Sequence, residues 1–74
     1  MTKQVLDFSL GQYEYIALCD LLKLTGVVDS GGQAKVLITE GYILRNGEVE
    51  TRKTAKIRAN ERIELDGVVI NVRE

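Results

Sequence analysis

Basic side chains are concentrated in the middle third of this 74-residue chain. Residues 35 to 58 carry a net charge of +3 in a chain whose overall net charge is −1, and the segments on either side each carry −2. Such a cluster favours phosphate as a partner, because arginine grips phosphate with a planar fork and bound cations release counterions from nucleic acid. The cations of this segment are Lys35, Arg45, Arg52, Lys53, Lys56 and Arg58.

Charge alone leaves a second interpretation of this cluster open. Lysines and arginines along a strand also serve as a solvated edge that prevents aggregation. The chain as a whole lacks the excess of cations that is usual in domains that bind nucleic acid. Any binding of nucleic acid would therefore depend on this local cluster and not on the overall charge of the chain.

Three further positions, together with Lys35, offer groups that could bind an anion. Gly31 and Gly32 leave backbone amides open at the start of a predicted helix, where partial positive charge favours an anion. The simpler alternative is that two glycines loosen the turn between helices. Lys35 lies one turn into that helix and is expected to face a nucleic-acid backbone. Lys23 could join it, or could pair with Asp20 three residues away.

The residue types give little support to an enzymatic or metal-dependent function. The chain has no histidine, which excludes nucleophilic schemes that depend on an imidazole. Its single cysteine, Cys19, cannot form an internal disulfide, and we interpret it as a small buried hydrophobe. Glu48 and Glu50 lack the neighbours that acid–base catalysis requires. We expect no enzyme activity, no cofactor and no metal site.

Length and hydropathy predict a single domain that spans residues 1–74. No apolar stretch approaches the ~20 residues of a membrane span, and Asp7 interrupts any signal-peptide core. We therefore expect a cytoplasmic monomer that folds unaided and has no membrane partner.

The first half of the chain predicts an extended segment followed by a helix. An apolar run at residues 5 to 10 indicates an edge strand or an arm packed on the core. From Glu14 to about Leu24, apolar residues recur at three- and four-residue spacing, which predicts a helix that closes at Gly26. Tyr13, Tyr15 and Tyr42 could stack on bases. Because Tyr15 falls on the apolar helical face and Tyr42 begins a strand, packing is the favoured interpretation.

The second half predicts another helix and two hairpins. Ser30 is a suitable N-cap for a helix with an apolar stripe that ends at Gly41. Asn46-Gly47 between two short runs indicates a tight hairpin, and Gly67 indicates a second turn between β-branched, alternating segments. The sequence therefore predicts an α+β fold, in which two packed helices are followed by a small, mainly antiparallel, twisted sheet.

Several short motifs then occur together in a specific order. They are Leu22-Lys23-Leu24, Ser30-Gly31-Gly32-Gln33-Ala34-Lys35, Ile38, Gly41, Ile43, Asn46-Gly47-Glu48 and Arg52-Lys53. In this order and spacing they resemble the alpha-L RNA-binding motif, which is named for small-subunit ribosomal protein four. The resemblance covers residues 8 to 72 and is nearest to short stand-alone bacterial proteins called YbcJ-like or YaaA-like.

This resemblance implies two helices against a small twisted sheet and a function in binding structured or double-stranded RNA, with ribosomal RNA as one candidate and DNA left open. Two departures matter. Gly31 stands where the wider superfamily usually has an arginine, so Lys35 becomes the more important cation of the second helix. Asn60-Glu61 stands where the family often has Gly-Asp before a late strand. The same turn is expected to form, because Asn tolerates the left-handed conformation that Gly adopts there.

We therefore predict a non-enzymatic RNA-binding protein whose basic patch contacts the phosphate backbone. The predicted RNA-binding residues are Lys35, Arg52, Lys53, Lys56, Lys23, Arg45, Arg58, Gly31 and Gly32. The alternative, prompted by the overall acidity of the chain, is a small protein–protein interaction module that uses a sheet edge and its charged surface.

Overall fold

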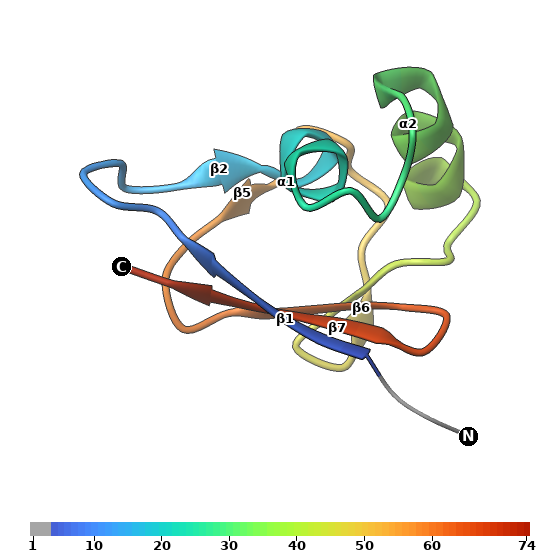
Figure 1. The fold of residues 1–74 in the computed structure, drawn as a ribbon. Coiled ribbons are helices and arrows are strands. Elements are labelled where there is room, and N and C mark those ends of the chain that lie inside the picture. The colour runs from blue at the N-terminus through green and yellow to red at the C-terminus, as the bar shows by residue number, and fades with distance from the viewer. Residues whose placement is uncertain (1–3) are drawn as a thin grey trace.

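A computed structural model describes residues 4–74 of the chain. Its main layer is a five-stranded sheet with spatial order β1-β7-β6-β3-β4, and two helices lie on one side of that sheet (Figure 1). The strands are β1 (Gln4–Ser9), β3 (Leu44–Arg45), β4 (Glu48–Val49), β6 (Arg62–Leu65) and β7 (Val68–Arg73). The helices are α1 (Leu18–Leu24) and α2 (Gly31–Thr39), and a two-stranded sheet of β2 (Ile16–Ala17) and β5 (Lys56–Ile57) lies beside α1.

The α+β class is confirmed, but the sheet differs from the prediction in its order along the chain. The edge strand predicted at residues 5 to 10 forms as β1, and because it precedes both helices and belongs to the main sheet, the predicted order of two helices followed by a sheet is wrong. The main sheet is mixed: β1 pairs in parallel with β7, from Gln4 opposite Val68 to Ser9 opposite Arg73, whereas its other pairings are antiparallel, as predicted for most of the sheet. A parallel pair needs a long crossover, and here nearly the whole chain, including both helices, forms that crossover.

The first helix begins four residues later than predicted. The prediction starts at Glu14, whereas α1 starts at Leu18, because the preceding residues are extended and pair with β5. The amides of Leu18 and Cys19 then donate to the carbonyls of Ala55 and Lys53, each over 3.0 Å. These distant carbonyls satisfy the first amides of α1, so tertiary contacts decide where the helix starts.

The signals that end and begin helices are confirmed. The Ser30 hydroxyl accepts a hydrogen bond from the amide of Gln33 at 3.2 Å and caps α2. Gly26 and Gly41 follow the last residues of α1 and α2 with φ of 78° and 86°, the left-handed conformation that glycine adopts without strain. Both helices therefore end where the sequence places a glycine.

The predicted turns are also confirmed. Asn46 and Gly47 connect β3 to β4 with φ of 52° and 88°, as a type I′ hairpin requires. Asp66 and Gly67 connect β6 to β7 in the same way. Asn60 adopts a φ of 72°, so the turn that replaces Gly-Asp forms with asparagine in the left-handed region.

One hydrophobic core lies between the sheet and the helices. Cys19 packs against this core but is only partly buried, so the interpretation of a buried residue is too strong. The core residues are Leu10, Leu18, Leu21, Leu22, Val28, Ala34, Ile38, Ile43, Ala55, Ile57, Ile63, Ile70 and Val72.

Within residues 4–74, no helix is long and apolar enough to cross a membrane. In the same residues, no group of acidic, histidine or cysteine side chains is arranged to hold a metal ion.

Candidate nucleic-acid interface

The basic segment that follows the first hairpin, residues 52–58, is fixed through its backbone. It passes behind α1 in Figure 1 and ends in β5. The α1 amides hold the carbonyls of Lys53 and Ala55, and the Ala55 amide closes a turn on the Arg52 carbonyl at 3.1 Å. A fixed backbone presents its exposed cationic side chains in one arrangement, which reduces the entropy that a ligand must remove on binding.

Strand alternation sets the direction of the cations in β5. Ile57 is fully buried in the core, whereas its neighbours Lys56 and Arg58 are exposed. Successive side chains of a strand point to opposite faces, so the burial of Ile57 turns both neighbouring cations outward. The sequence predicts both residues as RNA ligands, and the structure places them on one face.

Arg45 connects the first hairpin to this basic segment. Its Nε and Nη2 atoms donate to Glu61 over 2.7 and 3.0 Å, and its Nη1 donates to Glu50 over 3.1 Å. Nη2 also donates to the carbonyl of Lys56 at 2.9 Å. With a side-chain exposure of 23%, Arg45 is largely occupied by protein partners, which suits it to holding the segment in place.

Glu61 completes this network on the other side of Arg45. It accepts a hydrogen bond of 2.6 Å from the amide of Arg58 and another of 3.1 Å from the side chain of Asn46. Burial alone would raise the pKa of Glu61, but the hydrogen bonds from Arg45 and from the Arg58 amide outweigh it and lower that pKa. Glu61 is therefore a stable anion that holds the backbone amide of Arg58 in place.

Glu50 is the second anion of the network. Hydrogen bonds from the guanidinium of Arg52 are the main reason that the pKa of Glu50 falls from 4.5 to about 2; burial opposes this, and the Arg52 amide and Arg45 add to the lowering. Arg52 contacts both carboxylate oxygens of Glu50, over 3.1 and 3.2 Å. Because the Arg52 side chain is 73% exposed, its guanidinium faces solvent while it pairs.

The ion pairs divide the cations of the described residues into two groups. In the first group, Arg45, Arg52, Arg62 and Arg73 each contact a carboxylate. The second group has no acidic partner within residues 4–74 and consists of Lys23, Lys35, Lys53, Lys56 and Arg58. Because an unpaired cation can contact a phosphate without giving up an ion pair, the second group is the more available for a ligand.

A hollow of about 320 Å³ is lined by two paired cations, Arg45 and Arg52, and two unpaired ones, Lys56 and Arg58. Four of its lining residues are basic, and the described residues contribute no acidic side chain to its lining. Such a surface concentrates positive potential and attracts an anion. The lining residues are Arg45, Arg52, Thr54, Ala55, Lys56 and Arg58.

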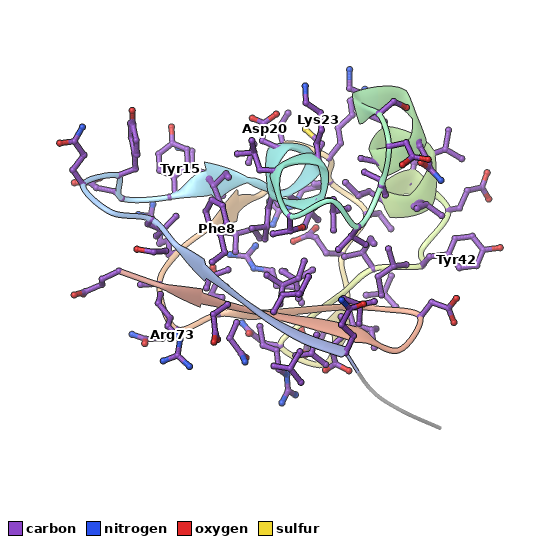
Figure 2. All side chains as sticks on the ribbon, in the orientation of Figure 1. Phe8, Tyr15, Asp20, Lys23, Tyr42 and Arg73 are labelled. Carbon is purple, nitrogen blue, oxygen red and sulfur yellow. The ribbon has the colours of Figure 1, made fainter. Side chains whose placement is uncertain are left out.

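The remaining predicted residues lie on the helices. Lys23 is exposed near the end of α1, and Figure 2 shows it beside Asp20 on the side of α1 that faces away from the sheet. Lys35 is exposed on α2, and Gly31 and Gly32 form its first turn. Nothing lies within 4 Å of a Cβ added at Gly31, and the amide of Gln33 in this first turn is already held by the Ser30 hydroxyl.

Sequence reasoning places Tyr15 and Tyr42 wrongly. Tyr42 is 63% exposed and precedes β3, so it neither begins that strand nor packs as expected. Helical spacing puts Tyr15 on the inner face of a helix, but it is 43% exposed on the extended segment before β2. The Lys56 ammonium lies 5.1 Å and the Arg58 guanidinium 5.6 Å from the centre of its ring. These are cation–π distances. Only the pairing of β2 with β5 reveals the contact, because nothing local in the sequence indicates it.

Comparisons with known proteins identify the family of the chain. A model of the S4 domain family matches residues 8–73. YbcJ of Escherichia coli (strain K12) is 48% identical over 65 residues, which cover 88% of this chain and 93% of YbcJ. RlbA of Bacillus subtilis (strain 168), which is named a probable ribosome maturation protein, is 37% identical over 54 residues that cover 73% of this chain and 76% of RlbA.

A solved structure shows the same fold. The solution structure of YbcJ from E. coli has a TM-score of 0.73 and 46% sequence identity, and the match covers 92% of this chain and 86% of that one. That structure is described as revealing an alpha-L motif involved in RNA binding. The resemblance predicted from the order of short motifs is thereby confirmed.

Proposed function

The chain belongs to the S4 domain family, and on that premise we propose that it is a non-catalytic protein that binds structured RNA through the phosphate backbone. The observation that carries the proposal is the outward-facing set of unpaired cations on residues 53–58, next to a hollow lined by four basic residues. Phosphate contacts of this kind supply affinity that depends little on sequence.

We assign different roles to the cations that line the hollow and to Lys53 beside them in the chain. Lys53, Lys56 and Arg58 would contact phosphate directly, because each is exposed and has no carboxylate partner among the described residues. Arg52 would contact phosphate in competition with Glu50. Arg45 would act mainly as a positioning residue, since Glu50, Glu61 and a backbone carbonyl already occupy its guanidinium.

The helices would add a second line of contacts. Lys35 is exposed one turn after Gly31 and Gly32, which begin α2, and Lys23 is exposed on α1. Double-stranded RNA has a deep, narrow major groove that side chains cannot read, so proteins recognise it mostly by shape and by its phosphates and 2′-hydroxyls. Cations on separate elements of a rigid fold suit that mode of recognition.

The test measures the affinity for a perfect RNA duplex across a series of salt concentrations. Affinity should fall steeply with salt, and the double variant Lys53→Gln with Lys56→Gln should bind more weakly with a log–log salt slope smaller by about 2, roughly 1 for each phosphate that is no longer neutralised. Glutamine is preferred to glutamate because it removes the positive charge without adding a negative one. A DNA duplex of the same sequence measures whether binding extends to DNA.

Arg73→Gln is the matched control for this experiment. Arg73 is also an exposed cation, but it pairs with Asp7 and lies on the side of the sheet away from the helices (Figure 2). Its replacement should leave RNA affinity and the salt slope unchanged. Equal weakening by both variants would mean that only net charge matters, and unchanged binding in the double variant would overturn the proposed interface.

One observation supports a protein-interaction module as a second candidate. β1 is the outermost strand of the main sheet, and its Val5 is 57% exposed. An open edge of this kind can accept a further strand from a partner. A pull-down with and without ribonuclease separates the two functions, because partners bridged by RNA are lost on digestion whereas a strand added to β1 is retained.

A further inference from the structure

An open, largely apolar groove of about 850 Å³ lies outside the basic hollow. It is formed by the end of β1, the loop at residues 10–15 and one side of α1. Figure 2 shows Phe8 and Tyr15 at this end of the molecule, next to α1. Tyr13 is 71% exposed and Leu24 is 64% exposed, so large apolar groups face solvent here. Exposed apolar surface gathered in a groove is typical of a binding site.

Tyr15 belongs to both the groove and the basic surface. Ile16 pairs with Ile57 and Ala17 pairs with Lys56, so the register continued by one residue sets Tyr15 opposite Arg58. Because Ile57 points into the core, Tyr15, Lys56 and Arg58 share the outer face of this two-stranded sheet. The distances of 5.1 and 5.6 Å from the ring to the two cations agree with that register.

We propose that the groove receives an unpaired nucleobase of the same RNA whose phosphates contact Lys56 and Arg58. This inference rests on the proposed function and makes it more specific, because it names RNA with a bulged or looped nucleotide beside a duplex as the ligand. A perfect duplex would use the cations alone.

The chemistry of the two surfaces matches the two ends of one nucleotide. A phosphate needs cations, which β5 supplies, and a base needs an aromatic or apolar surface, which Phe8, Tyr13 and Tyr15 supply. Tyr15 lies between these surfaces, so a nucleotide whose phosphate meets Arg58 places its base near the ring.

The acidic groups at the groove favour the base over other occupants. The charged residues that line the groove are two acids, Glu14 and Asp20, and one cation, Lys23. The two acids disfavour a phosphate, whereas a carboxylate accepts hydrogen bonds from the exocyclic amino groups of bases. The groove is therefore suited to the uncharged end of the nucleotide, and the cations beyond Tyr15 are suited to the charged end.

The experiment compares two RNAs, a perfect duplex and the same duplex with a single unpaired nucleotide. The protein should bind the bulged RNA more tightly by roughly 5- to 150-fold, the ratio that corresponds to the measured range for stacking one base on an aromatic ring. Tyr15→Leu keeps apolar bulk in the groove but removes the ring, so it should bring this ratio close to one. Its salt slope on the perfect duplex should stay unchanged, because the cations that meet phosphate are all retained.

Tyr42→Leu is the control for general loss of an exposed ring. Tyr42 is 63% exposed and lies on the opposite side of the molecule from Tyr15 (Figure 2), so its replacement should leave the ratio intact. Equal affinity of the wild-type chain for the two RNAs, or an unchanged ratio in Tyr15→Leu, would overturn the inference while leaving the proposed function standing. Absence of binding to either RNA would overturn both.

Discussion

Arg45 and Glu61 form a two-point ion pair, with Nε 2.7 Å from Oε1 and Nη2 3.0 Å from Oε2, although sixteen residues separate them in the chain. The pair joins the first hairpin to the turn that follows β5. Glu61 also holds the amide of Arg58, and Arg45 holds the carbonyl of Lys56. One ion pair thus fixes the backbone on both sides of Ile57, the buried residue between the two exposed cations.

Replacing Arg45 with glutamine should destabilise the fold and loosen this segment. The change leaves two partly buried carboxylates without their shared partner, which should cost about 1.5–3 kcal/mol. Hydrogen exchange of the Arg58 amide should become faster, because Glu61 would no longer be held in place to accept from it. Arg62→Gln, which removes a more exposed ion pair with Glu64, should cost less than about 1 kcal/mol. Equal costs for the two variants would contradict the role given to Arg45.

The low pKa of Glu50 predicts how stability depends on pH. Its pKa is about 2 in the folded chain, below the ordinary 4.5, so its contribution is fully present above about pH 4.5 and is lost as pH falls toward 2. Glu61, whose pKa is also lowered, contributes with the same sign. Thermal unfolding midpoints should therefore fall through this window. Glu50→Gln should show a shallower fall, and an identical slope would mean that Glu50 does not titrate as described.

Alanine should change the stability of the fold in opposite directions at Gly41, which follows α2, and at Gly32, which lies in the first turn of α2. Gly41 has a φ of 86°, and its added Cβ would lie 3.7 Å from Val49, so backbone strain alone should cost about 1–2 kcal/mol. Gly32 has ordinary helical backbone and no atom nearer than the Ser30 hydroxyl at 3.9 Å, so alanine there should stabilise by up to about 1 kcal/mol. Urea midpoints that shift in the same direction for both variants would contradict this assignment.

Local signals in the sequence predict the turns and caps, because each depends on residues next to each other. Ser30 acts through its side-chain hydroxyl on an amide three residues later, whereas Gly41 and the Asn46-Gly47 turn act through their own backbone, and all three occur as predicted. The direction of β1 relative to β7 is not predictable in this way, because alternating burial is the same for parallel and antiparallel partners. The start of α1 escapes prediction because it depends on carbonyls of Lys53 and Ala55, more than thirty residues later.

The site shows the same limit. Charge distribution identifies the basic segment, and the structure places its cations together at the surface. Composition does not distinguish Arg45, which is held by two carboxylates, from Lys53, which has none among the described residues. Tyr15 is misplaced on a helix because Leu18, Leu21 and Leu22 do follow helical spacing, and the pattern continues by chance to residue 15.

The pairing of Arg52 with Glu50 yields a final prediction about RNA binding. The Nε and Nη2 atoms of Arg52 both donate to Glu50. When Arg52 contacts a phosphate, these two donors must either leave the Glu50 carboxylate or be shared between the carboxylate and the phosphate. Glu50 and phosphate therefore compete for Arg52. Removing the competing charge with Glu50→Gln should raise RNA affinity at low salt by up to about fivefold, the range expected for one exposed ion pair.

The outcome separates competition from structural support. Arg52→Gln should lower RNA affinity, and in the double variant Glu50→Gln with Arg52→Gln the gain from Glu50→Gln should disappear, because the cation for which the acid competes is gone. A gain that persists in the double variant would show general electrostatic repulsion by Glu50 instead. A loss of affinity in Glu50→Gln alone would show that the carboxylate is needed to hold Arg45 and Arg52 in their binding positions, and would contradict the competition.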